Sequence, residues 1–348
     1  MTLQALIYKG LTMSTATKNI DILKQLFNNL SEKEKQLFLG DISGQNSLEK
    51  VIAAKEVSKC PHCDSTHFVK NGTKCNNQRY LCRDCKKSFV EQTGTILYNS
   101  QKGIEVWENY IHCMIEKYPL RKCAKICDIN LATAFAWRHK ILDALQNMMT
   151  DVELDGVVQA DETFTAISYK GNHKSFKLPR TAYKRGTKAS KRGLSTEKVC
   201  VPCAVNLDGL SVAKISNLGK PSLKDLQKVL DGNISKNSVF VTDSLRPYQK
   251  LSLDMELNHI RIATKKRSNG LFNIQMVNNY HSRLKDLITH RFKGVATKYL
   301  NNYLVYHNFV NFAKGSSESK ESVLLDFIRN TLCTSKTADL SSRPAVPV

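Results

Sequence analysis

The chain has 348 residues, is 41% hydrophobic and carries a formal net charge of +21. Its length exceeds the usual size of one domain, so we expect two or three domains with ample core. No apolar run approaches the roughly 18 residues that cross a bilayer, and no signal peptide is recognisable, which predicts a cytoplasmic protein. The charge favours a polyanionic partner, because Lys and Arg displace counterions from phosphates. The alternative is a merely basic or ribosome-associated protein.

The first segment, residues 1–50, has the apolar spacing of a pair of helices. Ser31 and Glu34 stand at capping-box spacing and predict the start of the second helix. We interpret this segment as a helical N-terminal arm, which either packs on the rest of the protein or contacts DNA.

Two C-x2-C pairs follow, within a segment of strand-like runs at residues 55–92. Their spacing predicts a zinc ribbon, since each pair brings two sulfurs to one ion and the hairpin between the pairs completes a tetrahedron. Four thiolates leave no position open for water, so the predicted zinc is structural. Its ligands are Cys60, Cys63, Cys82 and Cys85. Basic residues around the hairpin favour nucleic acid as its partner, and a protein partner is the alternative.

Residues 100–150 have the apolar spacing of three helices. A short helix, a tight turn and a longer helix that starts near Leu131 resemble a helix-turn-helix, whose second helix would carry DNA contacts. Arg138 and Lys140 on that helix are predicted to contact phosphates. A generic three-helix bundle is the alternative.

From residue 152 onward, short β-branched runs alternate with helical ones, which predicts a mixed α/β sheet. We expect three strands, a helix, a strand, a helix, a strand and a final helix, in that order. Asp161 ends the run GVVQAD and Asp243 ends the run SVFVTD, so each acid stands at the end of a strand. Glu162 is expected on the opposite face of its strand from Asp161.

The final helix is predicted to begin near Gln275. It would place Asn278, Ser282 and Lys285 on one face, because residues four and seven apart lie one above another. An amide, a hydroxyl and an ammonium on one face suit a metal ion and a phosphate, and a solvated polar face is the alternative.

These residues resemble a known family. The stretches ADET, VTDS and SRLK…RFKGVATKYLNNYL, together with the N-x6-K spacing, are similar to the ISXO-like insertion-sequence transposases of the DDE superfamily. The resemblance spans residues 55–312 and implies a ribonuclease-H-like catalytic domain at residues 152–312. In this family Asn, Glu or His fills the third acidic position.

The resemblance and the residue chemistry imply a site for two Mg²⁺ or Mn²⁺ ions, because two adjacent carboxylates repel unless divalent ions bind them. The implied ligands are Asp161, Asp243 and Asn278, and Asn279 is a second candidate for the third position. Lys285 would meet a DNA phosphate near the scissile bond. An amide brings no charge, so both a working and a weakened enzyme fit.

A basic loop is expected between the first two strands, where no acid falls between Thr163 and Thr196. We expect this loop to order on DNA. Its predicted DNA contacts are Lys184, Arg185, Lys191 and Arg192. Residues 313–348 are predicted to form a short helix and a loose tail.

Together these features predict a multidomain DNA transposase with structural zinc and catalytic magnesium. It would bind the terminal inverted repeats of double-stranded DNA, cleave a strand and join it to target DNA, as a homo-oligomer associated with the nucleoid and without a membrane partner. One alternative is a catalytically inactive, transposase-derived DNA-binding protein. Another is a nuclease or resolvase-like enzyme that cuts without joining.

Overall fold

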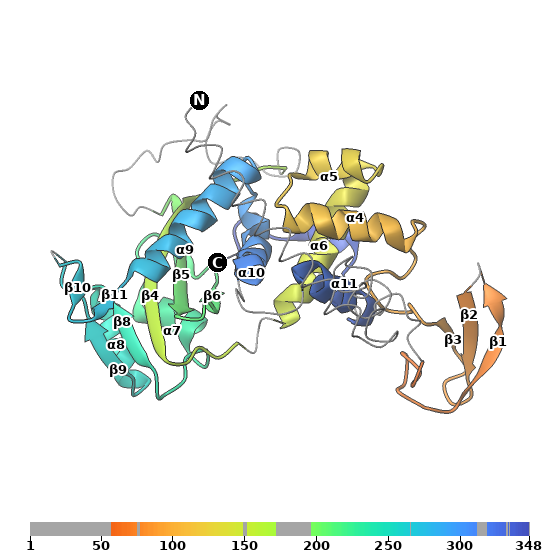
Figure 1. Cartoon of the computed structure of the whole chain (residues 1–348), viewed down its shortest axis with the longest axis horizontal. Coiled ribbons are helices and arrows are strands. Elements are labelled where there is room, and N and C mark those ends of the chain that lie inside the picture. The colour runs from red at the N-terminus through yellow and green to blue at the C-terminus, as the bar shows by residue number, and fades with distance from the viewer. Residues whose placement is uncertain are drawn as a thin grey trace, which may run out of the picture.

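Three regions follow one another along the molecule: a small β-sheet at one end, a helical layer in the middle and a larger mixed sheet at the other end (Figure 1). The expected N-terminal arm lies outside the residues that the structure describes. No helix in the described part is long and apolar enough to span a membrane. This computed structural model describes residues 57–74, 77–148, 152–171, 196–264, 266–311, 319–331, 333 and 335–347.

The small sheet contains three antiparallel strands, β1 (Phe68–Lys74), β2 (Asn77–Cys82) and β3 (Ser88–Val90), with β2 in the centre. One aromatic side chain from each strand fills its core. The rings of Phe68, Tyr80 and Phe89 lie with centroids 5.5 Å apart in every pair. Because so small a core buries little apolar surface, a ribbon of this size needs a further cross-link such as a metal ion.

The helical layer confirms the three helices predicted from the sequence. They are α4 (Ile104–Ile115), α5 (Leu120–Ile126) and α6 (Leu131–Met148). Trp107 of α4 stacks on Trp137 of α6 with ring centroids 3.6 Å apart, and Tyr110 meets the edge of Trp137 at 5.4 Å. The inward face of α6 is therefore occupied by aromatic packing.

Two helices from the C-terminal part of the chain complete the same core. Buried side chains of α10 (Leu300–Asn311) and α11 (Lys320–Asn330) share one apolar cluster with α4 and α6. Leu300 and Leu304 of α10 also belong to a cluster under the larger sheet. Helix α10 thus joins the helical layer to the sheet through continuous apolar packing.

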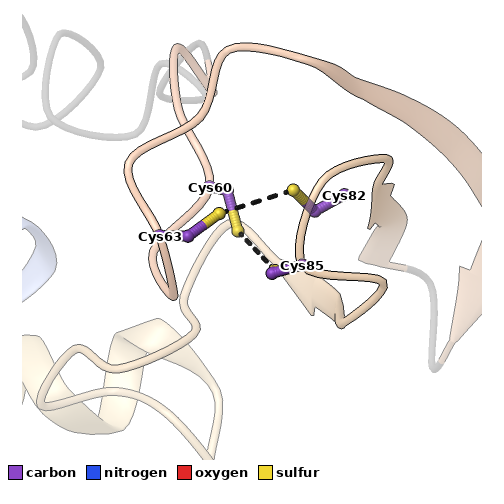
Figure 2. Close-up of side chains that lie close together, drawn as sticks. All are labelled: Cys60, Cys63, Cys82 and Cys85. Atoms are coloured by element: carbon purple, nitrogen blue, oxygen red, sulfur yellow. Dashed lines mark hydrogen bonds between the residues drawn. The ribbon is translucent and has the colours of Figure 1, made fainter.

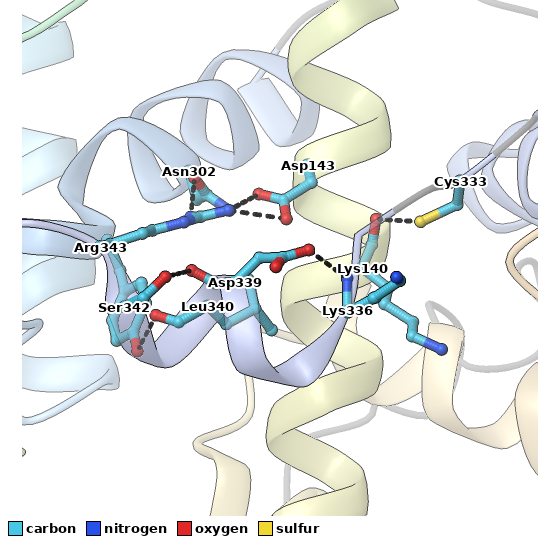
Figure 3. A network of polar contacts seen from close by, with 10 residues as sticks. Lys140, Asp143, Asn302, Cys333, Lys336, Asp339, Leu340, Ser342 and Arg343 are labelled. Atoms are coloured by element: carbon cyan, nitrogen blue, oxygen red, sulfur yellow. Dashed lines mark hydrogen bonds and ion pairs between the residues drawn. The ribbon is translucent and has the colours of Figure 1, made fainter.

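The short helix predicted near the end of the chain is present as α11. The described residues 335–347 after it include a further helix, so the prediction of a loose tail is wrong for them. Arg343, just after α12 (Thr337–Ser342), donates to both carboxylate oxygens of Asp143 on α6 at 2.7 Å (Figure 3). Asn302 of α10 also donates to Asp143, at 2.6 Å. A bidentate Arg–carboxylate pair is among the stronger polar contacts, and this pair holds the end of the chain against two helices.

The larger sheet has the strand order β6-β5-β4-β8-β9. Strand β4 pairs antiparallel with β5 and parallel with β8, so the sheet is mixed, as expected for a ribonuclease-H-like core. The third predicted strand is split in two, and its second half, β7 (Asn217–Leu218), pairs back with β5. The other strands are β4 (Val157–Ala166), β5 (Lys198–Asn206), β6 (Ser211–Ala213), β8 (Val239–Thr242) and β9 (Asn258–Arg261).

Helices cover both faces of this sheet. The buried side chains of α7 (Leu223–Leu230) and α8 (Arg246–Asp254) pack with Val158 and Phe240 on one face. Helix α9 (Gln275–Asp286) packs with Val199, Val201 and Cys203 on the other face. The sequence analysis missed a hairpin before α9, formed by β10 (Ser268–Asn269) and β11 (Phe272–Asn273).

Candidate active site

The two strand-end acids lie side by side at one edge of the parallel pair. The ladder between β4 and β8 ends with Ala160 opposite Thr242, and the next residue on each strand is an acid. Neighbouring strands lie roughly 4.8 Å apart, and residues opposite each other point to the same face. The register therefore brings Asp161 and Asp243 together, as the sequence analysis expected of two strand ends.

Each carboxylate is oriented by a nearby backbone N–H. The amide of Glu162 donates to Oδ1 of Asp161 at 2.9 Å, and the amide of Leu245 donates to Oδ1 of Asp243 at 2.9 Å. Leu245 is the N-cap residue of α8. One oxygen of each carboxylate thus has a protein donor, and the other remains available to a ligand.

Gln159 fixes the final helix against the catalytic strand. Its side chain is 4% exposed, and its Oε1 accepts from the backbone amides of Met276 at 2.8 Å and Val277 at 3.3 Å. These amides belong to the first turn of α9, which has no side-chain cap of its own. The sequence signal for this contact was a glutamine within the otherwise apolar run GVVQAD, two residues before Asp161. We did not use this signal in predicting the site from the sequence.

Helix α9 turns one polar face toward Asp161. His281 is buried, and its Nδ1 lies 3.9 Å from Oδ2 of Asp161. Lys285 is close enough that its charge lowers the pKa of Asp161. Asn278 lies one turn before His281 on the same side of the helix and is exposed. The structure brings together Asp161, His281 and Lys285. The predicted third ligand, Asn278, lies on the same face of α9 but is exposed to solvent.

His281 was missed by the sequence analysis. Burial and, after it, the charge of Lys285 together lower the pKa of its imidazole to about 4, so the ring is neutral at physiological pH. Its Nε2 is buried without a hydrogen-bond partner in the described residues. The spacing N-x2-H-x3-K could have identified it, because residues three and seven apart share a helix face.

The acids are difficult to ionise in this environment. Burial and, after it, the negative charge of Asp243 together raise the pKa of Asp161 to about 6. Burial also raises the pKa of Glu162 to about 7, with contributions from both Asp161 and Asp243. Tyr248 of α8 donates to Glu162 at 3.2 Å, on the face opposite α9, as expected. Perturbed carboxylates clustered in this way are typical of functional sites.

The donor set fits a hard divalent cation. Two carboxylates supply oxygen ligands, and a bound cation would relieve both the repulsion and the cost of burial that raise their pKa values. Asn278 can add an amide oxygen and His281 an imidazole nitrogen. Metal binding at this site is a proposal taken up below.

The four predicted zinc ligands come together in the small sheet. Their sulfur atoms all lie within 4.8 Å of one another (Figure 2). The Sγ atoms of Cys60 and Cys85 are 3.7 Å apart, and those of Cys63 and Cys82 are 3.6 Å apart. Tetrahedral zinc with bonds of about 2.3 Å requires sulfur separations of about 3.8 Å, so the cluster fits zinc.

The backbone of each cysteine pair supports this geometry. Asp64 and Lys86, the residues directly after the two pairs, both have left-handed φ values, of 57° and 59°. The backbone amides of Cys85 and Asp84 lower the pKa of Cys82 to about 6, which favours the thiolate that binds metal. Two matching turns therefore aim two pairs of sulfurs at one point.

The predicted DNA contacts have different outcomes. Arg138 is 2% exposed and donates to the carbonyl of Tyr118 at 2.8 Å, with its guanidinium 5.2 Å from the ring centre of Phe292. The prediction that Arg138 contacts phosphate is therefore wrong, because the C-terminal part of the chain covers this face of α6. Lys140 is half-buried, and its role stays a prediction. The four loop residues Lys184, Arg185, Lys191 and Arg192 lie outside the described residues.

Helix α5 carries the exposed charge of the helical layer. Arg121, Lys122 and Lys125 are exposed along it, next to Ile126, which is 49% exposed. Leu131 at the start of α6 is 39% exposed. This surface has the cations and apolar side chains that a DNA-contacting face uses, and the sequence analysis had placed those contacts on α6.

The comparisons with known proteins agree with the site. Residues 153–309 match the sequence model of the ISXO2-like transposase domain. The matched segment is thus similar to DDE-type transposase domains, and it contains Asp161, Asp243 and Lys285. The comparison does not test which residues bind metal.

One relative is described as an uncharacterized protein in the transposable element ISH50 of Halobacterium salinarum. It is 25% identical over 197 residues, which cover 56% of this chain and 65% of that protein, less than two thirds of its length. A solved structure of a pre-cleavage Mos1 transpososome matches with a TM-score of 0.24 and 9% identity, covering 60% of this chain and 77% of that chain. The ribonuclease-H-like assignment rests on the strand order rather than on that likeness.

Proposed function

We propose that the protein is a DNA transposase of an insertion sequence, which cleaves a strand at the transposon end and joins the freed 3′ end to target DNA. The observation that carries this proposal is the register of β4 and β8, which sets Asp161 beside Asp243 in a transposase domain. Such an enzyme works on chromosomal DNA and so belongs with the nucleoid in the cytoplasm.

Asp161 and Asp243 would hold divalent metal, with Asn278 as the third ligand. Bound Mg²⁺ or Mn²⁺ activates water or a 3′-hydroxyl and stabilises the leaving oxygen in phosphoryl transfer. The ammonium of Lys285 would bind a phosphate oxygen beside the scissile bond. The neutral ring of His281, whose Nδ1 lies 3.9 Å from Asp161, would serve as a metal ligand in place of Asn278.

Recognition of the transposon end would fall to the other two regions. The ribbon would bind one zinc ion through its four cysteines and present the exposed cations Lys70, Arg83, Lys86 and Lys87 to DNA. The exposed side of α5 would contact the backbone beside it. Synapsis of two transposon ends would require at least two copies of the chain.

A strand-cleavage and strand-transfer assay tests this proposal. The substrate is a labelled duplex that carries the inverted repeats flanking the coding sequence, with a plasmid as target and Mg²⁺ or Mn²⁺ as metal. The wild type should give joined products, and Asp161→Ala should give none while still binding the duplex. Asp208→Ala removes an exposed acid in the turn between β5 and β6 and should leave activity unchanged.

Asn278→Asp separates a working enzyme from a weakened one. Products from the wild type would support the amide as a competent ligand. End binding without products, rescued by Asn278→Asp, would show that the neutral amide weakens the metal site. Binding without products from either protein would favour the alternative of an inactive DNA-binding protein.

A further inference from the structure

A second charged site lies next to the catalytic helix. A cavity of about 470 Å³ opens between the turn after α4, helix α9 with the π-helical turn Leu287–Arg291 that follows it, and α10. Its polar lining comes from elements far apart in the sequence. The lining residues that matter are Lys117, Ser282, Arg283, Asp286, Arg291 and His307.

The lining is positively charged. Three cations face one acid, Asp286, whose only ion pair in the described structure is a long contact of 3.9 Å to Arg291. Burial and, after it, the nearby charge of Lys117 lower the pKa of His307 to about 3, so this ring is neutral. The pocket therefore has an excess of two positive charges.

Two of these cations have no partner. Within the described part of the chain, neither Lys117 nor Arg283 forms a hydrogen bond or an ion pair through its side chain. Burial lowers the pKa of Lys117, and the charges of Arg291 and Arg283 lower it further. Like charges gathered at a half-buried position destabilise the fold unless an anion binds between them.

The backbone conformation at Lys117 favours glycine, so the lysine side chain does not contribute to stability through this turn. Lys117 directly follows Glu116, the C-cap residue of α4, and has a left-handed φ of 59°. The backbone amide of Lys117 donates to the carbonyl of Met114 at 2.8 Å, and the backbone amide of Tyr118 donates to the carbonyl of Cys113 at 3.0 Å. This arrangement usually has glycine at the left-handed position, because a side chain there is strained.

The pocket borders the candidate active site on α9. Asn278, His281 and Lys285 lie on the face of α9 toward Asp161. Arg283 is two residues from both His281 and Lys285 and therefore points to nearly the opposite side of the helix, and Asp286 lies between these two directions. Ser282 stands between the two faces and lines the pocket. A DNA strand that passes the acids would therefore bring a neighbouring phosphate to this pocket, since each strand carries a charge about every 3.4 Å along the helix axis.

We propose that this pocket binds a backbone phosphate of the DNA strand that Asp161 and Asp243 act on. The inference rests on the proposed function of that site. Among the described lining residues, Leu287 is the one apolar side chain, and His307 supplies the one aromatic ring, with no Phe, Tyr or Trp to form a stacking platform for a base. The chemistry therefore fits a phosphodiester group rather than a whole nucleotide, and the contact would be independent of DNA sequence.

The test compares charge-removing variants by DNA binding at several salt concentrations. Fluorescence anisotropy with a labelled duplex is measured for the wild type, for the double variant Lys117→Gln/Arg283→Gln and for Lys228→Gln. Lys228 is an exposed lysine on α7, on the opposite face of the sheet. The double variant should bind several-fold more weakly, and its slope of log K against log salt should fall by about 0.9, as for one lost phosphate contact.

Lys117→Gly keeps the test independent of folding. Glycine relieves the left-handed backbone, so this variant should unfold at the same or a higher temperature than the wild type while losing DNA affinity. Lower affinity together with undiminished thermal stability supports the pocket. Equal affinities and slopes for the double variant and Lys228→Gln would overturn it.

Two further outcomes separate the pocket from the proposed function. Metal-dependent cleavage by the wild type, with the double variant behaving like the Lys228→Gln control, would overturn the pocket and leave the active site intact. A wild type that binds no DNA would overturn both. Inorganic phosphate serves as a further probe. Suppose that it raises the unfolding temperature of the wild type but not of the Lys117→Gln/Arg283→Gln variant, and that both proteins bind DNA equally well. That result would identify a site for free phosphate and overturn the assignment to a DNA strand.

Discussion

The two candidate metal sites of this protein are built in opposite ways. The four cysteines lie on two short turns, within 25 positions of one another, and their sulfurs already stand at the separations of a zinc tetrahedron. Asp161 and Asp243 come from different strands 82 positions apart and meet only through the register of a sheet. The cysteine site would hold together a small sheet whose own core is too small to stabilise it. The acid site, in contrast, is formed by the folding of a larger sheet that has its own core.

This difference predicts how each site behaves without metal. The ribbon has three aromatic rings as its core, so we expect it to need a bound ion for stability. The sheet has two full apolar clusters and holds its acids at a cost in stability, since burial and mutual repulsion raise their pKa values. Metal binding should therefore stabilise the fold of the ribbon. At the larger sheet it should offset the burial and mutual repulsion of the two acids.

The largest effect is expected from removing the zinc ligands. Cys82→Ser with Cys85→Ser should release one zinc per chain and unfold β1 to β3, because zinc binding contributes about 10–16 kcal/mol in domains of this kind. Zinc content by atomic absorption and chymotryptic cleavage near Phe89 measure the two effects. Cys333→Ser, a half-buried thiol outside the cluster, is the control. Unchanged zinc content in the double variant would disprove the ribbon site.

A smaller effect of opposite sign is expected at the acids. Asp161→Asn should raise the free energy of unfolding by about 2 kcal/mol at pH 8 in EDTA, because it removes a charge whose pKa burial raises to about 6. Urea unfolding monitored by tryptophan fluorescence measures this change. Loss of stability in the variant would show that the carboxylate is held favourably without metal.

The raised pKa values of these acids also make the stability of the fold depend on pH. Asp161 and Glu162 have pKa values near 6 and 7 in the folded chain, above those of unfolded Asp and Glu, so the folded state binds more protons between about pH 4 and pH 7. The stability of the wild type relative to Asp161→Asn should therefore fall as pH rises through this window in EDTA. Mg²⁺ should restore it at pH 8 and have little effect at pH 4. A flat difference across the window would contradict the burial of these acids.

The smallest effect distinguishes the third ligand. If Asn278 binds metal, Asn278→Ala should weaken Mn²⁺ binding about tenfold, or about 1.4 kcal/mol. Electron paramagnetic resonance of free Mn²⁺ measures the affinity, with Gln275→Ala, an exposed position on the same helix, as the control. A greater loss in His281→Ala than in Asn278→Ala would instead assign the third position to the imidazole.

The local patterns of the sequence predicted most elements of the fold. Paired C-x2-C spacing identified the cysteine cluster, and β-branched runs that end in an acid identified β4 and β8. These features succeed because their signal is contained within a few consecutive residues. The hairpin of β10 and β11 was missed because each strand has only two residues and no alternation to detect.

The tertiary contacts that sequence reasoning missed join segments that are distant in the sequence. Gln159 accepts from amides 117 and 118 positions away, and Arg343 pairs with Asp143 from 200 positions away. Arg138 has the position of a recognition-helix cation, yet helices from the end of the chain cover it. Local periodicity gives the buried face of a helix, but it does not tell which later segment will cover the remaining face.

The central claim is that Asp161 and Asp243 form one metal-dependent site that cleaves DNA. It is tested most directly by the rate of strand cleavage of end-bearing duplex by the wild type and by Asp243→Asn, with Mg²⁺, with Mn²⁺ and with EDTA. The account predicts cleavage by the wild type only when metal is present, and a loss of at least a thousandfold in Asp243→Asn with end binding retained. Cleavage by Asp243→Asn at the rate of the wild type would contradict it.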